Sequence, residues 1–341
     1  RQDIEKALHR GPHKSCHEYH QFLSEEFIDM INKQQWVVLP YSEARKLPNL
    51  RLSPPGVVPQ RNRRPRWIVD YSFYGVNADT LDLAAREAMQ FGHALDRILR
   101  EIILANPDDG PVQLMKVDLS DGFYRIDLCV DDIPKLGVLF PTAPGEPKLV
   151  AFPLVLPMGW KNSPPIFSTA TETIADLANT KIASSTESDA PTHALDDLAA
   201  SILSPTPAHA LQTLISGKIP SLQIPVERDP SLPSLPSPLA YIDVFVDDFI
   251  ACVQGRNRGR QVRRILFQAI DSVFRPLEES DPSTRREPIS MKKLLQGDCS
   301  WGTIKTVLGW IINTVTQTIH LPEHRQQRLA EILAEIPKSQ K

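Results

Sequence analysis

The sequence predicts an α+β protein, and three observations support this fold class. Apolar residues recur at helix spacing in the segment SEEFIDMINK, where Phe27, Met30 and Ile31 would share one face. Short β-like runs, WVVL and WIVDY, are separated by proline-rich loops. The run LAYIDVFVDDFIACV is apolar on both sides of two acids, which is typical of a strand, a tight turn and a second strand. The 341 residues, 41% of them hydrophobic, suffice for the core of one large domain or of two to three packed subdomains.

The elements expected in the first half follow in chain order. Residues 1–34 form an N-terminal helical segment, and residues 36–77 form a small sheet with mobile connections. A helix over 83–104 precedes VQLMKVDL, an apolar strand that ends at an aspartate, and AFPLVLP is the next strand. A helix then covers about 164–178, because prolines are tolerated in the first helical positions and the Asn-Ser pair before them can cap free amides.

The stretch 179–239 interrupts this pattern. It is rich in Ser, Pro, Ala and Thr and poor in aromatic residues, so we expect an inserted low-complexity loop with one or two short helices near 194–216. After the strand, turn and strand of LAYIDVFVDDFIACV, we expect a helix over 258–276. Strands around TVLGWII and QTIHL and a helix from Pro322 to Ile336 complete the chain.

Charge is distributed unevenly along the chain. A formal net charge of −3 excludes a protein that is basic all over, so nucleic-acid binding would need a local basic face. Two runs carry basic residues with no acid among them: Arg45, Lys46, Arg51, Arg61, Arg63, Arg64 and Arg66, and then Arg256, Arg258, Arg260, Arg263 and Arg264. We interpret the first run as a candidate phosphate-binding face, and we slightly favour a solvated face for the second.

The four cysteines, Cys16, Cys129, Cys252 and Cys299, lie far apart without a CxxC pair. This spacing disfavours a disulfide framework or a cysteine zinc site, so we expect an intracellular protein, cytoplasmic or nuclear. No apolar run reaches the roughly 18 residues of a membrane span, and the N-terminus lacks a signal pattern and an initiator Met. We therefore expect no membrane partner and treat the chain as a fragment of a longer polyprotein.

Three aspartates occur where strands end or turn. Asp118 closes the strand MKVD, and Asp247 with Asp248 occupies the turn of VFVDDF. Each signal alone is ordinary, because acids are common in turns, but carboxylates flanked by apolar strand are costly unless they are paired or bound to metal. Phosphoryl transfer from a nucleoside triphosphate uses two divalent ions, and hard ions such as Mg²⁺ prefer carboxylate oxygens. The three aspartates are therefore candidate ligands of two catalytic ions.

Four segments together resemble a known enzyme family. MKVDLSDGFYRI, LPMGWKNSPPIF, YIDVFVDDF and VLGWII follow the order and form of successive motifs of reverse transcriptases, and they look most like those of retrotransposons. The resemblance covers about residues 33–336. It implies a right-hand polymerase, with fingers over 35–115, a ferredoxin-like palm over 116–312 that contains the inserted loop, and the start of a thumb over 313–341. It also implies that Asp118, Asp247 and Asp248 bind two Mg²⁺ ions, with Mn²⁺ as an alternative.

The resemblance extends to residues that would contact the nucleotide. Phe123 matches the aromatic ring that excludes a ribose 2′-hydroxyl, and Met158, Gly159 and Lys161 match the segment that packs on the nucleotide and template base. In RRPRWIVDY, Arg66 matches the arginine that holds the triphosphate, and Arg64 or Arg63 stands in for a lysine of the family. The stretch ISMKKLL offers Lys292 or Lys293 as the general acid. Three positions depart from residues that are common in the family. Phe245 stands where many relatives have Tyr, and Met158 stands where many have Gln or Phe. Arg63 or Arg64 stands where the family has Lys.

A rival site and two rival functions remain at this point. His9, His13, Cys16, His17 and His20 cluster in sequence, and two of the histidine pairs have the i, i+4 spacing of metal ligands on a helix, although a polar surface helix explains them better. The favoured function is RNA-directed DNA synthesis with a primed RNA or DNA template and dNTPs as partners, in a polyprotein with ribonuclease H or integrase domains. The alternatives are a catalytically silent scaffold that binds nucleic acid and an RNA-directed RNA polymerase.

Overall fold

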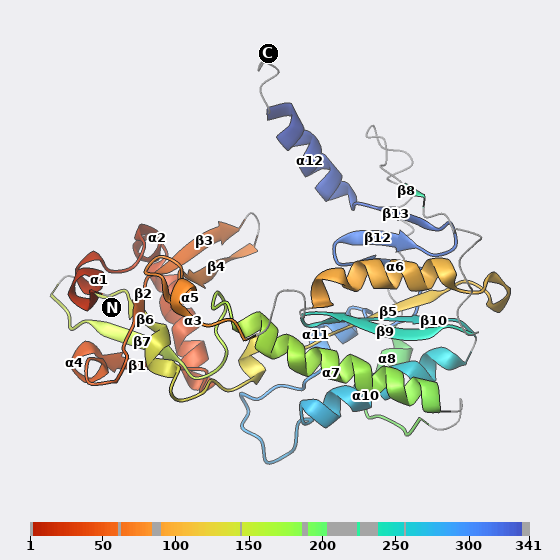
Figure 1. Cartoon of the computed structure of the whole chain (residues 1–341), viewed down its shortest axis with the longest axis horizontal. Helices are drawn as coiled ribbons and strands as arrows, with labels where there is room; N and C mark the ends of the chain where they lie inside the picture. The colour runs from red at the N-terminus through yellow and green to blue at the C-terminus, as the bar shows by residue number, and fades with distance from the viewer. Residues whose placement is uncertain are drawn as a thin grey trace. The chain divides into compact units, whose positions relative to one another are not determined.

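The computed structural model describes residues 3–60, 63–83, 90–143, 145–185, 190–202, 224–225, 238–255 and 257–335. Helices and strands are mixed along the chain, so the expected α+β composition is confirmed (Figure 1). The chain forms two compact units. The first unit comprises Arg1–Met89, Asp121–Thr169 and Leu277–Arg286, and the second comprises Gln90–Ser120, Ala170–Pro276 and Glu287–Lys341.

The first unit combines a four-stranded sheet, in the order β1-β7-β6-β2, with the separate hairpin β3-β4. Its elements are α1 (Ile4–Arg10), α2 (Lys14–Glu18), α3 (His20–Asn32), β1 (Trp36–Pro40), α4 (Tyr41–Ala44), β2 (Leu52–Ser53), β3 (Pro55–Gln60), β4 (Arg63–Val69), α5 (Val76–Asp79), η4 (Gly122–Arg125), η5 (Ile133–Leu136), β6 (Gly137–Phe140), β7 (Leu149–Pro153) and the first turns of α7 (Ser163–Ser184). The strands expected within 36–77 are present, but they do not form one small sheet: β7 and β6 lie between β1 and β2, and among the described strands β4, which contains WIV, pairs only with β3.

Four aromatic rings hold α3 against the sheet and the hairpin of the first unit. The ring of Phe27 contacts Trp36 at a centroid distance of 5.7 Å and Phe140 at 5.0 Å, and Trp36 contacts Trp67 at 5.2 Å. Phe27 and Trp36 are both fully buried. Edge-to-face packing of this kind adds about 0.5–1.5 kcal/mol per pair to the burial of apolar area. The helical periodicity read from SEEFIDMINK therefore points Phe27 into this core.

The second unit contains two sheets, with strand orders β5-β10-β9 and β11-β12-β13-β8. Its elements are η2 (Gln90–His93), α6 (Ala94–Leu104), η3 (Pro107–Asp109), β5 (Gln113–Asp118), the rest of α7, α8 (Asp196–Ser201), β8 (Ile224–Pro225), β9 (Ala240–Phe245), β10 (Asp248–Val253), α10 (Arg258–Val273), α11 (Met291–Leu295), β11 (Ile304–Val307), β12 (Trp310–Asn313), β13 (Thr318–His320) and α12 (Glu323–Glu335). The helix expected over 83–104 begins later, at Ala94 after the 3₁₀ turn, and residues 84–89 lie outside the described residues.

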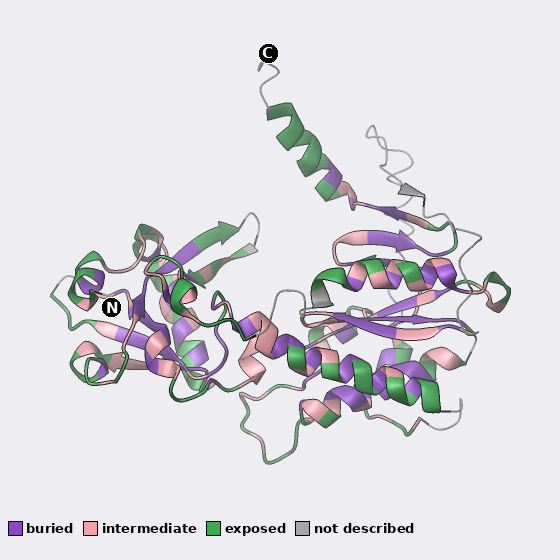
Figure 2. Ribbon diagram, in the orientation of Figure 1, coloured by how far each residue is buried: buried purple, intermediate pink, exposed green. Residues whose placement is uncertain are grey.

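Strand β10 is buried on both faces (Figure 2). Ile250 and Cys252 pack with Ile98 and Ile102 of α6, while the alternate residues along the strand are buried as well. A continuous apolar run such as FIACV is what a strand covered on both faces requires. The two carboxylates at its start therefore lie at the end of a rigid, dry element.

A buried ion pair joins α6 to β9. The guanidinium of Arg97 binds the carboxylate of Asp243 through two contacts, Nε to Oδ2 at 2.6 Å and Nη2 to Oδ1 at 2.7 Å. The hydroxyl of Tyr241 donates to the same carboxylate at 2.7 Å. Asp243 is 4% exposed, so its charge is stable only because these donors satisfy it. Asp243, the first of the three acids in the motif YIDVFVDDF, thus has a structural role.

The inserted stretch is more ordered at its start than expected. Helix α7 continues to Ser184, past the expected end at 178, because Asn179 closes the edge of β9. Its side-chain amide donates to the carbonyl of Ile242 at 2.7 Å and its oxygen accepts from the Ile242 amide at 2.9 Å. Helix α8 falls within the range where a short helix was expected. Most of the remainder, 203–223 and 226–237, lies outside the described residues.

The second basic run is the clearest correction to the sequence interpretation. Arg260, Arg263 and Arg264 of α10 all bind the carboxylate of Asp196 in α8, at 2.7 to 2.8 Å. Arg263 and Asp196 are buried, so a solvated face is wrong for this part of the run. The partner is more than sixty positions away in sequence, which is why the run looked free of acids.

No helix in the described ranges is long and apolar enough to cross a membrane.

Candidate active site

Two of the three candidate aspartates face each other on neighbouring strands of the second unit. Strands β5, β10 and β9 run antiparallel, and their register pairs Asp118 with Asp248, and Asp248 in turn with Phe245 (Figure 1). Asp247 occupies the two-residue loop that joins β9 to β10, and its carbonyl accepts a hydrogen bond from the Leu119 amide at 3.3 Å. The backbone therefore brings the strand-end acid and the turn acids to one edge of the sheet.

The turn that carries these acids has an unusual backbone. Val246 adopts a φ of 59°, a left-handed conformation that costs a β-branched residue of order 1–3 kcal/mol. The pairing of Phe245 with Asp248 closes the loop so tightly that its first residue must turn this way. Strain of this kind persists only where the surrounding strands impose it, and it marks a turn whose geometry matters more than its stability.

The carboxyl groups of Asp118 and Asp248 share a hydrogen bond. Burial above all, together with the hydrogen bond to Asp118 and the charges of Asp118 and Asp247, raises the pKa of Asp248 to about 8. Burial also acts to raise the pKa of Asp118, but the hydrogen bond from Asp248 and the charge of Lys293 outweigh it and lower that pKa. Burial and the Asp118 charge raise the pKa of Asp247. Near neutral pH, Asp248 therefore holds the proton that the pair shares.

Lys293 is brought to the site by main-chain pairing. The segment before α11 runs beside the end of β5, where the Ser120 amide donates to the carbonyl of Pro288 at 2.8 Å and the Ser290 amide donates to the carbonyl of Asp118 at 2.9 Å. Lys293 in α11 then places its Nζ 3.4 Å from Oδ2 of Asp118. The charge of Asp118 raises the pKa of Lys293, so the ammonium stays protonated at neutral pH.

The structure separates the two candidate lysines. Lys293 is partly buried beside Asp118, whereas the side chain of Lys292 is exposed and makes no contact with the three aspartates among the described residues. Asp298 is a neighbour that the motif did not single out, because its Oδ2 lies 3.2 Å from Nζ of Lys116 and 3.9 Å from Nζ of Lys293. Its sequence context, QGDCS, offers no pattern that would have identified it.

The chemistry of this donor set fits hard divalent cations. Three carboxylates that crowd together at one sheet edge need either a shared proton or positive charge, and the raised pKa of Asp248 reflects that need. Within the described ranges, no group of three or more His, Cys, Asp or Glu side chains is already arranged to hold a metal ion.

The segment that contains Met158, Gly159 and Lys161 lies in the first unit, where it packs on β4. Nη2 of Arg66 lies 3.2 Å from Sδ of Met158, so these two candidate residues are in contact. Gly159 has a φ of 93°, and a Cβ at this position would lie 2.8 Å from the carbonyl oxygen of Val69. This glycine is therefore required by close packing within the unit, whatever its role toward a ligand.

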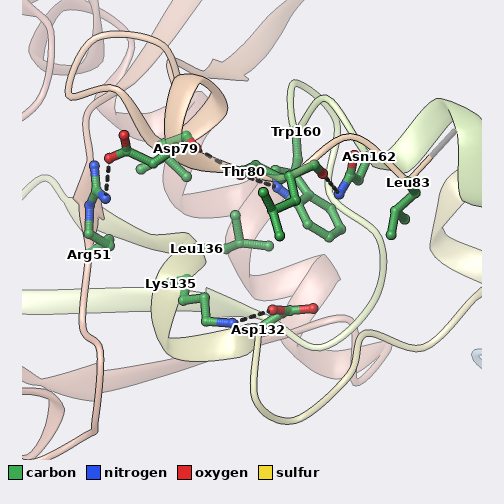
Figure 3. A pocket seen from close by; sticks show the side chains of 11 residues that line it. Arg51, Asp79, Thr80, Leu83, Asp132, Lys135, Leu136, Trp160 and Asn162 are labelled. Atoms are coloured by element: carbon green, nitrogen blue, oxygen red, sulfur yellow. Dashed lines mark hydrogen bonds and ion pairs between the residues drawn. The ribbon is translucent and has the colours of Figure 1, made fainter. Parts of the chain in front are cut away.

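Residues 77–82 hold this segment in place. The side chain of Asn77 donates to the carbonyl of Gly159 at 2.9 Å and accepts from the Lys161 amide at 3.0 Å. The Trp160 indole donates to the Thr80 hydroxyl, as Figure 3 shows. The side-chain amide of Asn162 donates to the carbonyl of Leu81. Trp160 and Asn162 also line a cavity of about 370 Å³. Asn77 therefore positions this segment, and its sequence context, GVN, did not reveal that role.

The remaining candidates of the first unit have protein partners. Phe123 in η4 is half-buried and meets Phe167 of α7 edge to face, with ring centroids 5.2 Å apart. Arg64 places Nη2 2.7 Å from Oε1 of Glu26. Arg51 of the same basic run pairs with Asp79 at 2.7 Å, and Lys46 pairs with Glu43. The run is therefore less positive in space than in sequence, and the side chain of Arg63 lies outside the description.

The N-terminal histidines do not converge on a common point. Nε2 of His13 lies 3.4 Å from Oδ2 of Asp70, and its Nδ1 accepts a hydrogen bond from Nη2 of Arg10 at 3.1 Å. Cys16 is buried, and its thiol donates to the carbonyl of Pro55 at 3.2 Å. Burial raises the pKa of that thiol to about 12, which keeps it protonated. The cluster is thus dispersed over α1, α2 and the start of α3.

Comparison with protein-family models finds none that matches the chain, and comparison with curated proteins finds no significant match. Any functional conclusion therefore depends on the order of the motifs and on the geometry of the aspartates.

Proposed function

We propose that the chain is the nucleotidyltransferase core of a reverse transcriptase, which extends a primer on an RNA template with deoxynucleotides. The observation that carries the proposal is the register of Asp118 against Asp248, with Asp247 in the turn between strands. An acid at the end of one strand and two in the adjacent hairpin turn match, in chain order, the catalytic motifs named above. Three carboxylates crowded together destabilise the folded protein, so their presence supports a role that requires negative charge at this place.

The proposed chemistry is the transfer of a nucleotide to a primer 3′-hydroxyl. Asp118, Asp247 and Asp248 are the residues that would hold two Mg²⁺ ions, or Mn²⁺, and such ions when bound lower the pKa of the hydroxyl and hold the triphosphate. Lys293 is the proposed general acid. Its protonated ammonium beside Asp118 would give a proton to the pyrophosphate as the bond to the α-phosphorus breaks.

The proposed roles of the first-unit residues depend on their order in the sequence. Arg66 and Arg64 would hold the triphosphate, Met158, Gly159 and Lys161 would pack on the base, and Phe123 would exclude the ribose 2′-hydroxyl. The contact of Arg66 with Met158 supports a shared function for these two segments. Phe123 distinguishes DNA synthesis from RNA synthesis, since an enzyme that makes RNA needs room for the hydroxyl at that position.

Primer extension with the full chain, an RNA template, dNTPs and Mg²⁺ tests the proposal. We expect extension by the wild type and a loss of at least about a hundredfold in Asp247→Asn, because a carboxamide binds Mg²⁺ far more weakly than a carboxylate does. Asp131→Asn is the matched control, because Asp131 is exposed and lies outside the site. Extension that survives Asp247→Asn would refute the site, and a folded wild type without any extension would support the silent scaffold instead.

A further inference from the structure

A second cavity of the first unit lies outside the proposed polymerase site. It has a volume of about 360 Å³ and is lined by the turn between α1 and α2 and by residues of β6 and β7 and their connection. Pockets of a few hundred Å³ are of the size that receives small organic ligands. None of the polymerase candidates lines it, so its function is a separate question.

All the ionisable side chains among the described residues that line this cavity are basic. His9 and Arg10 come from the last turn of α1, His17 from α2, and Lys148 from the residue before β7. No aspartate or glutamate is among the lining residues that the structure describes. Elsewhere in the unit the basic side chains mostly have acidic partners, as Arg51 does with Asp79. The cavity therefore presents an uncompensated positive field.

The basic groups of the cavity are available to a ligand. Within the described part of the chain, the imidazoles of His9 and His17 and the ammonium of Lys148 make no hydrogen bond or ion pair. All three side chains belong to exposed residues. Arg10 differs, because its guanidinium lies 4.0 Å from the ring centroid of Phe73 and contributes charge from the rim.

One of the residues that line the cavity, Thr142, has a hydroxyl without a hydrogen-bond partner in the described part of the chain. Oγ1 of Thr142 is buried and has no hydrogen-bond partner among the described residues. A buried hydroxyl without a partner costs about 1–3 kcal/mol, and an anionic oxygen would accept its proton. The hydroxyl and the three free basic groups therefore call for the same kind of ligand atom.

The rest of the wall is apolar. Leu8 and Leu139 are buried behind this wall, and its partly exposed apolar surface comes from Phe140 and Leu149. An inorganic anion would leave these side chains uncovered, whereas an aromatic or other apolar body would cover them. The position of the wall is fixed by β7, since the Tyr41 amide donates to the carbonyl of Lys148 at 2.8 Å.

We propose that this cavity binds a small molecule that carries a phosphate group on an apolar or aromatic body. The phosphate meets His9, His17, Lys148 and the Thr142 hydroxyl, and the body lies on Phe140 and Leu149. This site is independent of nucleotidyl transfer, and its occupancy needs neither the three aspartates nor a divalent ion.

Calorimetric titration of the full chain with phenyl phosphate tests the proposal. We expect saturable binding of one molecule per chain, weaker binding of inorganic phosphate, and none of benzyl alcohol, which lacks the charge. Lys148→Glu and His17→Glu should each weaken phenyl phosphate binding about tenfold or more, because each change removes a donor and adds a repulsive charge. Lys148→Gln, a milder change at the same exposed position, should weaken it severalfold.

Lys14→Glu is the matched control, because Lys14 also lies on α2 but its side chain is 92% exposed and outside the cavity. This variant should bind phenyl phosphate as the wild type does. Equal affinity in Lys14→Glu and Lys148→Glu would overturn the proposal, as would saturation by benzyl alcohol. A third outcome is that the wild type binds an RNA oligonucleotide but not phenyl phosphate, and that Lys148→Glu abolishes the RNA binding. This outcome would assign the face to a nucleic-acid backbone instead.

Discussion

Replacing Asp248 by asparagine should stabilise the protein in the absence of divalent ions. Burial and the neighbouring carboxylates raise the pKa of Asp248 from 3.8 to about 8. At pH 7 the unfolded chain releases this proton while the folded chain keeps it, which disfavours folding by up to about 4 kcal/mol at 1.4 kcal/mol per pKa unit. Solvent reaches the site and Asp118 shares the proton, so we expect a gain of about 1–3 kcal/mol in the variant.

The pH dependence gives the sign of the effect. A folded-state pKa above the unfolded value stabilises the wild type fully below about pH 4, and this contribution is lost as the pH rises through about 8. The carboxamide introduced by Asp248→Asn cannot titrate, so the advantage of this variant should be small at pH 4 and grow toward pH 8. Mg²⁺ should reverse it, because only the wild type gains stability from ion binding.

Urea unfolding followed by tryptophan fluorescence, in EDTA at pH 4 and pH 7, measures this difference. Asp131→Asn, which changes an exposed aspartate, should leave the free energy of unfolding within about 0.5 kcal/mol of wild type. A variant Asp248→Asn that is less stable than wild type at pH 7, or whose advantage does not depend on pH, would refute the account of a crowded carboxylate cluster.

Three further variants test other parts of the structure by the same unfolding assay. Arg97→Leu should destabilise the second unit by about 3–5 kcal/mol, because Asp243 would keep a buried charge without its bidentate partner. Val246→Gly should stabilise by about 1 kcal/mol by relieving the left-handed φ of 59°. Gly159→Ala should destabilise by about 1–3 kcal/mol, since its Cβ would lie 2.8 Å from a carbonyl oxygen and φ is 93°.

Two of these variants, Arg97→Leu and Gly159→Ala, have a matched control in the same chain. Arg100→Leu changes an arginine of α6 whose side chain is 68% exposed, and it should cost less than about 1 kcal/mol. Gly92→Ala places a Cβ with no atom within 4 Å, so it should be nearly neutral. The argument about Arg97 would be contradicted if Arg97→Leu lowered the free energy of unfolding as little as Arg100→Leu does. The argument about Val246 would be contradicted if Val246→Gly destabilised the protein. The argument about Gly159 would be contradicted if Gly159→Ala were as neutral as Gly92→Ala.

The hairpin and the strand that carry the candidate aspartates were predictable from sequence because their signals are local. An apolar run interrupted by two acids leaves few conformations other than two strands around a turn. Strand β5 was predictable for the same reason, since VQLMKVDL ends its apolar run at Asp118. The register that pairs Asp118 with Asp248 sets the last residue of β5 opposite the first residue of β10.

Features that depend on partners far away in sequence were not predictable. The arginines of α10 looked like a free basic run because Asp196 lies in a segment of low complexity, and Asn179 was assigned to a loop although it caps the edge of β9. The choice between Lys292 and Lys293 depends on the pairing of residues 288–290 with the end of β5. Gly159 was assigned to ligand contact, whereas its packing against Val69 alone requires a glycine.

Binding of Mn²⁺, followed by electron paramagnetic resonance, tests most directly whether Asp118, Asp247 and Asp248 form the divalent-ion site. We expect the wild type to bind Mn²⁺ in competition with Mg²⁺, and Asp247→Asn and Asp248→Asn each to weaken that binding about tenfold or more, while Asp131→Asn leaves it unchanged. Mn²⁺ binding that is the same in all four proteins would contradict the account.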